Sequence, residues 1–191
     1  MTDFEFVFLL YALILGLSMV ELLTGLGRAM EYKYAREAEH KTFKIGWLTP
    51  LLAGFVMLDL ISFWLFAWAI REQIAVSSAT VTLVIAFAAS YYLAARLVFP
   101  TIPDAFTDLD DHFYRVRRVV LGILIALVLV QWGYLISQVG FENMVSNLLT
   151  VGLTIVLLVL MGAGMISRKD AFNIVVLIAL NARYLAIYLI L

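Results

Sequence analysis

The stretch WLTPLLAGFVMLDLISFWLFAWAI, residues 47 to 70, decides the fold of this chain because it is long and apolar enough to cross a bilayer. A spanning α-helix needs about 20 consecutive apolar residues, and this run carries one charged side chain, Asp59, at its middle. A charge at that depth costs about 2.5 to 3.5 kcal/mol on insertion scales, so it normally faces protein or water, finds a partner or takes up a proton. Asp59 is therefore the first candidate for a functional residue.

The composition extends the membrane assignment to the whole chain. Of its 191 residues 64% are hydrophobic and 14% are charged, and the mean hydropathy is +1.02, outside the range of soluble domains. The absence of cysteine excludes disulfides, thiolate metal sites and thiol nucleophiles, and both histidines, His40 and His112, lie in polar segments. We expect no cofactor. The net charge is −1 and the basic residues are scattered, so nucleic acid is not an expected partner.

Six apolar segments of spanning length follow one another along the chain. The first begins within MTDFEF, a stretch that is acidic where a signal peptide would be basic, so we expect this segment to be retained as a helix. The sequence predicts an all-α fold, a polytopic membrane protein whose single domain is a bundle of six transmembrane helices. The predicted spans are 4–27, 47–70, 78–99, 116–138, 147–166 and 171–191.

The distribution of basic residues predicts the orientation of these spans. Arg71 lies alone in the connections on one side, and Arg183 lies inside the last span. Cytoplasmic loops are enriched in Lys and Arg, so we expect both termini outside in a bacterial-type inner membrane, with residues 30–44 and 101–115 cytoplasmic and residues 72–76 and 140–146 external. The basic residues of the opposite side are Arg28, Lys33, Arg36, Lys41, Lys44, Arg96, Arg115, Arg117, Arg118, Arg168 and Lys169.

Two of the cytoplasmic connections carry their own structural predictions. Residues 28–44 are rich in helix formers and contain neither proline nor glycine, so we expect the first helix to continue beyond the membrane. The next connection opens with two prolines and then places Phe106, Leu109 and Phe113 at helical spacing. This pattern predicts an interfacial amphipathic helix that runs into the fourth span.

The first span carries a polar face made of Ser18, Glu21, Gly25 and Arg28. Residues at this spacing lie on one side of a helix, and the small ones let another helix approach closely. Glu21 is either a lining and proton-accepting residue of a transport pathway, or one half of a structural pair with an arginine such as Arg96.

The two charges nearest the middle of the membrane are Asp59 and Arg183. We expect them to form an ion pair, which is either a structural contact or a gate. Arg183 can instead extend toward the outer interface, since it lies close to the end of its helix. Ser62 lies on the same face as Asp59. Asn181, Tyr184 and Tyr188 form a polar stripe on the opposite side of the last span from Arg183, so this span has no fully apolar face and we expect it to be the most enclosed.

Polar stripes also run along the outer halves of the fourth and fifth spans. They line an outward-facing polar cavity that leads down to Asp59 and Glu21, or they bond the helices to one another in a dry bundle. The stripes are Gln131, Tyr134 and Gln138 in one span and Asn147, Thr150 and Thr154 in the other.

A cluster of acidic residues before the fourth span is the only place rich in metal-ligating residue types. Enzymes of lipid metabolism hold magnesium and pyrophosphate with such clusters, but here the spacing favours pairs four residues apart on an exposed helix face, Asp108 with His112 and Asp111 with Arg115. The weak metal candidates are Asp104, Asp108, Asp111 and His112.

These patterns favour a small channel or transporter for an ion or small polar solute, with proton linkage through Glu21 or Asp59 as an option. The alternatives are a non-catalytic membrane subunit that packs against partner chains or copies of itself, and an interface enzyme that uses the acidic cluster. Serine-nucleophile, phosphate-loop and zinc-protease motifs do not occur in the sequence, so an enzyme is the least favoured reading. The expected surroundings are the lipid bilayer.

Overall fold

The computed structural model describes residues 3–38, 43–71, 77–102, 106–139 and 148–190. Within these ranges the secondary structure is helical, apart from one isolated bridge between Lys44 and Asp108. The helices are α1 (Asp3–Ala38), α2 (Leu48–Ala69), α3 (Ser78–Val98), α4 (Leu109–Val139), α6 (Leu148–Ile166) and α7 (Asp170–Ile190).

Each of the six predicted spans coincides with one of these helices. All six are long and apolar enough to cross a membrane, which confirms the prediction of a helical bundle and makes the chain an integral membrane protein. α1 has 36 residues and is therefore about 54 Å long, well beyond the roughly 30 Å of a hydrocarbon core. The prediction that the first helix continues beyond its predicted span, 4–27, is confirmed.

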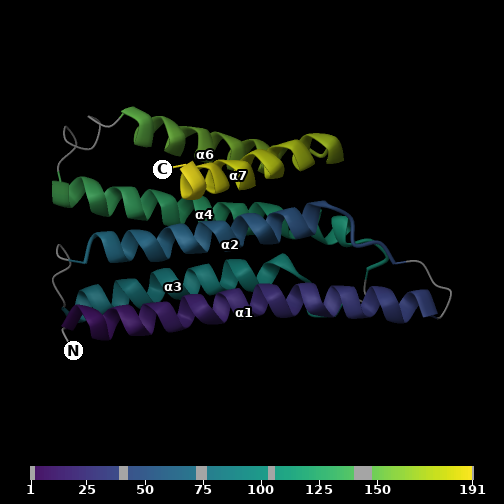
Figure 1. Cartoon of the computed structure of the whole chain (residues 1–191), viewed down its shortest axis with the longest axis horizontal. Helices are drawn as coiled ribbons and strands as arrows, with labels where there is room; N and C mark the ends of the chain where they lie inside the picture. The colour runs from purple at the N-terminus through teal and green to yellow at the C-terminus, as the bar shows by residue number, and fades with distance from the viewer. Residues whose placement is uncertain (1–2, 39–42, 72–76, 103–105, 140–147, 191) are drawn as a thin grey trace.

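The helices lie side by side in three pairs. Figure 1 shows α1 beside α3, then α2 with α4, then α6 with α7. Both termini lie at one end of the bundle, which we call the terminal end. The opposite end holds the α1–α2, α3–α4 and α6–α7 connections, and we call it the basic end because all described Lys and Arg side chains except Arg71 and Arg183 belong to it.

Two predictions about individual segments need correction. The amphipathic stretch before the fourth span does run into it, but as the first turns of α4, and it turns its apolar side chains inward: Leu109 and Phe113 are buried in the bundle. Phe106 precedes the helix. The most enclosed helix is α2, not α7, because α2 lies in the middle pair and is covered from both sides.

The α1–α2 and α3–α4 connections are bonded to each other at the basic end. Lys44 donates its backbone N–H to the Thr107 carbonyl at 3.1 Å and accepts one from Leu109 at 3.0 Å. The Asp110 carboxylate caps α2 from outside, accepting the Leu48 N–H at 3.0 Å, and Gly46 comes so close to this carboxylate, at φ +67°, that no side chain fits there. A helix otherwise begins with unbonded N–H groups, so this contact fixes α2 against α4.

Candidate functional site

Asp59 lies in the middle of α2 and is almost fully buried, at 1% exposure. Tyr184 of α7 donates its hydroxyl to Asp59 Oδ1 at 2.5 Å. The Tyr91 hydroxyl of α3 lies 3.4 Å from Oδ2, but its single proton is directed at the Val56 carbonyl at 2.5 Å. Tyr184 is therefore the principal partner of this carboxylate.

Arg183 does not form the predicted ion pair with Asp59. Among the described residues, ion pairs within 4 Å join Glu21 to Arg28 and Arg96, and Lys33 to Glu37. Arg183 instead turns toward α6, where its Nε donates to the Leu153 carbonyl at 3.0 Å, and its guanidinium lies 4.8 Å from the centre of the Tyr184 ring. The pairing fails because each charge finds a nearer neutral partner, a tyrosine hydroxyl for one and a backbone carbonyl for the other.

The Arg183 Nη1 atom is buried and has no hydrogen-bond partner among the described residues. A buried donor without an acceptor costs about 1 to 3 kcal/mol, more when it is charged. This nitrogen belongs to a side chain that lines a cavity, so an acceptor oxygen inside that cavity can satisfy it.

The cavity beside Arg183, which we call the polar cavity, has a volume of about 190 Å³ and lies between α2, α4, α6 and α7. It extends from Thr150, exposed in the first turn of α6, to the buried carboxylate of Asp59. Seven of the residues that the sequence singled out line it, namely Asp59, Ser62, Gln131, Thr150, Thr154, Arg183 and Tyr184.

The other four predicted pathway residues, Ser18, Glu21, Tyr134 and Asn181, do not line this cavity. Asn181 donates to the Leu51 carbonyl at 3.0 Å and to that of Leu177 at 2.8 Å, which holds α7 against α2. Ser18 is buried and bonds the Ile14 carbonyl of its own helix. Tyr134 lines a separate cavity of about 410 Å³, which we call the apolar cavity, between α1, α2, α3 and α4. Asn147 lies outside the described residues.

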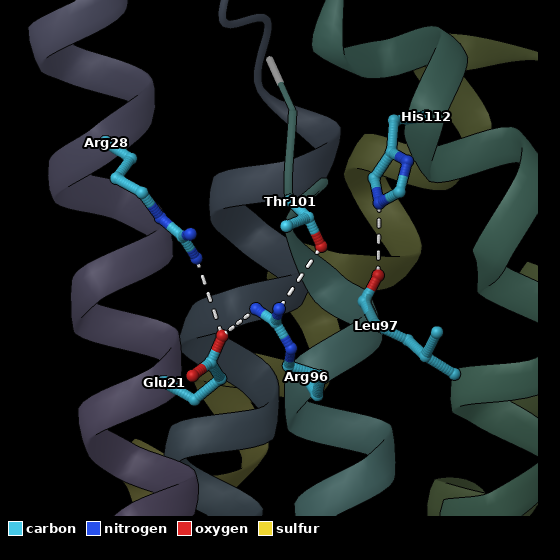
Figure 2. A network of polar contacts seen from close by, with 6 residues as sticks. All are labelled: Glu21, Arg28, Arg96, Leu97, Thr101 and His112. Atoms are coloured by element: carbon cyan, nitrogen blue, oxygen red, sulfur yellow. Dashed lines mark hydrogen bonds and ion pairs between the residues drawn. The ribbon is translucent and has the colours of Figure 1, made fainter. Parts of the chain in front are cut away.

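Glu21 is paired with arginines near the basic end and lines neither cavity. Its Oε1 accepts from Arg96 of α3 and from Arg28 Nη2 of its own helix at 3.4 Å, as Figure 2 shows. Arg96 Nη2 continues the network to the Thr101 hydroxyl at 3.2 Å. The sequence analysis gave a pair with Arg96 as the structural alternative for Glu21. This pair joins α1 to α3.

The acidic cluster does not assemble a metal site among the described residues, where no three His, Asp or Glu side chains converge. His112 is buried and donates its Nε2–H to the Leu97 carbonyl at 3.1 Å, in the last turn of α3 (Figure 2). Asp108 accepts the N–H of Asp110 at 2.9 Å, so it does not form the expected pair with His112. Asp111 is exposed, and Asp104 lies outside the described residues.

Sequence reasoning missed a buried arginine. Arg117 of α4 is 2% exposed, and it donates Nη1 to the Ser167 carbonyl and, at 3.3 Å, to Oδ1 of Asn173. Asn173 itself is fully buried and donates to the Ser167 and Lys169 carbonyls at 3.0 and 3.1 Å. The signal was present in the helical spacing, because Arg117 lies four residues from both Phe113 and Leu121 on the buried face of α4.

Comparison with protein families, with curated proteins and with solved structures finds no match. Function is therefore inferred from geometry. The polar cavity offers a carboxylate, a guanidinium with an unused donor, a tyrosine hydroxyl, two threonine hydroxyls, a serine and a glutamine amide. Such a set can bind a cation at Asp59, an acceptor oxygen at Arg183, or one small solute that carries both kinds of group.

Proposed function

We propose that this protein transports an ion or a small polar solute across the membrane, and that the polar cavity is its binding site. The supporting observation is that polar side chains from four helices line one cavity, among them the bonded pair of Asp59 and Tyr184. Side chains that only join helices in a dry bundle would contact each other and leave no space between them. Charged groups inside a membrane are costly, so a carboxylate and a guanidinium that share a cavity there favour a pathway.

The size of the cavity restricts the solute. A volume of about 190 Å³ holds several water molecules or a solute of a few non-hydrogen atoms. Asp59 is the proposed site for a cation or a proton, and Arg183 the proposed site for an acceptor oxygen. Ser62, Gln131, Thr150 and Thr154 supply neutral hydrogen-bonding groups that replace water around the solute.

The tight contacts at the basic end favour a carrier over an open pore. The helices are bonded together between the polar cavity and the basic end. The contacts are those of Arg117 with Asn173, of Glu21 with Arg96, and of Asp110 with the start of α2. In the proposed cycle the polar cavity receives the solute from the terminal end, and rearrangement of these contacts exposes it to the basic end. We propose that Asp59 couples the two steps by binding and releasing a proton or cation.

The proposed orientation places the basic end in the cytoplasm of a bacterial inner membrane and both termini outside. The expected external loops 72–76 and 140–146 lie outside the described residues. Single cysteines can be introduced cleanly because the chain has none of its own. We expect a membrane-impermeant thiol reagent to label Arg71→Cys from outside and the exposed Ile102→Cys only after the inner face is opened. The reverse pattern would overturn the orientation.

Flux through purified protein tests the transport proposal. Reconstituted wild type is expected to move protons, alkali cations or small neutral polar solutes, and Asp59→Asn is expected to abolish that flux and Arg183→Gln to reduce it. Asp111→Asn makes the same chemical change at an exposed site on the surface of α4 and should leave the flux unchanged. Absence of flux for all of these solutes, across a range of pH and voltage, would remove the proposal and favour a membrane subunit that packs against partner chains.

A further inference from the structure

The apolar cavity has more than twice the volume of the polar cavity. Its volume is about 410 Å³, and it lies toward the terminal end, between the α1–α3 pair and the α2–α4 pair. Its deep wall includes Phe63 and Leu127, which are both buried, at 2% and 6% exposure. Among its few polar side chains, Ser90 is satisfied by the Ala86 carbonyl of its own helix.

This cavity reaches the surface of the bundle between α3 and α4. Leu83 of α3 and Val130 of α4 line it and are 70% and 60% exposed, so they form its outer edge. Both residues lie within membrane-spanning helices, where the exposed surface faces lipid. We therefore expect this opening to face the hydrocarbon of the bilayer.

We propose that the apolar cavity binds one acyl chain of a membrane lipid, which enters between α3 and α4. Water is a poor occupant, because a buried water needs two to four polar partners, and apolar cavities of about 150 Å³ stay dry and take up small apolar molecules instead. This cavity is more than twice as large, and acyl chains surround its opening. Its volume and apolar walls match a flexible hydrocarbon chain.

A bound chain would lie against the wall of the polar cavity. Phe63 and Gln131 line both cavities, so they form the partition between them. Binding of the acyl chain does not depend on the proposed transport function, and it is tested by binding alone.

The test uses a phospholipid with a diazirine at the middle of one acyl chain, incorporated with the wild-type protein into nanodiscs and activated by light. Mass spectrometry then identifies the labelled residues. We expect labels on Phe63 and Leu127, which lipid at the outer surface does not reach, as well as on exposed residues such as Leu129. Labels confined to exposed residues would overturn the proposal.

Two alanine variants on α3 form a matched pair. Both alanines are exposed, but Ala86 lines the cavity and Ala89 does not. Ala86→Phe is expected to fill the opening and remove the labels from Phe63 and Leu127, and Ala89→Phe to leave them in place. Buried labels that survive in folded Ala86→Phe would contradict the proposal.

Competition provides a second readout that needs no variant. An excess of unlabelled fatty acid is expected to remove the label from Phe63, because the site holds one chain, and to leave the label on Leu129, where lipid exchanges freely. Equal loss at both residues would show that no saturable site exists and would also overturn the proposal.

Discussion

The two ends of the bundle use their polar residues in opposite ways. At the basic end polar side chains bond directly to neighbouring helices, as Arg117 does to Asn173 and Glu21 to Arg96. Toward the terminal end polar side chains of four helices line a cavity. Buried guanidinium nitrogens without a partner among the described residues occur at both ends, Arg28 Nε and Arg117 Nε at the basic end and Arg183 Nη1 beside the cavity. The two ends therefore differ in that a cavity of about 190 Å³ lies among the polar side chains toward the terminal end.

This difference separates residues that stabilise the fold from residues that are available for function. Hydrogen bonds to a charged group contribute about 1.5 to 3 kcal/mol each, so the contacts at the basic end should dominate stability. Side chains that face a cavity make few such contacts, and their removal should cost little. Substitutions at the basic end should therefore lower the free energy of unfolding most, and those around the polar cavity should mainly alter binding.

The largest effect is expected for Arg117→Met. The change removes two hydrogen bonds from a buried guanidinium and leaves the Asn173 amide oxygen without its donor. We expect the free energy of unfolding, measured in bicelles, to fall by about 3 kcal/mol. Arg118→Met is the control, because Arg118 is exposed and makes one contact, at 3.3 Å, to the Met165 carbonyl. If both changes lower the free energy of unfolding equally, the buried hydrogen bonds of Arg117 do not stabilise the basic end more than an exposed contact does.

The next effect concerns the close contact of α1 with the residue that follows α3. A Cβ added to Gly25 would lie 2.6 Å from Phe99 Cδ2 and 2.7 Å from its Cβ, so Gly25→Ala forces the two segments apart. We expect the free energy of unfolding to fall by about 2 kcal/mol, within the range of about 1 to 3 kcal/mol that is usual for overpacking. Gly27→Ala, two residues along the same helix, meets nothing within 4 Å and should leave stability unchanged or raise it by up to about 1 kcal/mol. Tolerance of alanine at both sites would contradict tight packing here.

A double-mutant cycle compares the two possible partners of Asp59. Asp59→Asn combined with Tyr184→Phe should show a coupling energy of about 1.5 kcal/mol, because the two side chains are bonded at 2.5 Å. Asp59→Asn combined with Arg183→Gln should show a weaker coupling, below about 1 kcal/mol, because the two charges interact without forming an ion pair. If the coupling in the second cycle is as strong as in the first, Asp59 and Arg183 form the ion pair that the sequence predicts.

The smallest effect is expected for Glu21→Gln. Glu21 neutralises two arginines but is partly exposed, so its loss should cost about 1 kcal/mol. Glu37→Gln is the control, because Glu37 forms an exposed pair with Lys33 four residues away, at 3.7 Å, which should contribute a few tenths of a kcal/mol. Since Glu21 lines neither cavity, the pH dependence of any flux should survive in Glu21→Gln. Loss of the pH dependence in Glu21→Gln would show that Glu21 belongs to the transport pathway.

Helical spacing predicts part of the candidate site, because polar residues three or four positions apart lie on the same side of their helix. Thr150 and Thr154 share a face of α6, and Gln131 and Tyr134 share one of α4, yet Gln131 lines both cavities and Tyr134 only the apolar one. Spacing shows that two residues point in similar directions. It does not show which neighbouring helix they meet, because that depends on how the six helices are arranged around one another.

What the sequence by itself determined is the membrane location, the number of spanning helices, the length of α1 and the gathering of basic residues at one end. These properties depend on the transfer of each segment to hydrocarbon, on helix propensity and on the charge of each connection, and all three follow from residues that are neighbours in the chain. Only the tertiary structure decided that Asp59 is bonded to Tyr184 instead of Arg183, that Arg117 is buried, and that space remains beside Phe63. Each of these depends on distances of a few ångströms between helices that are far apart in the chain, and those distances are set by the packing of all six helices together.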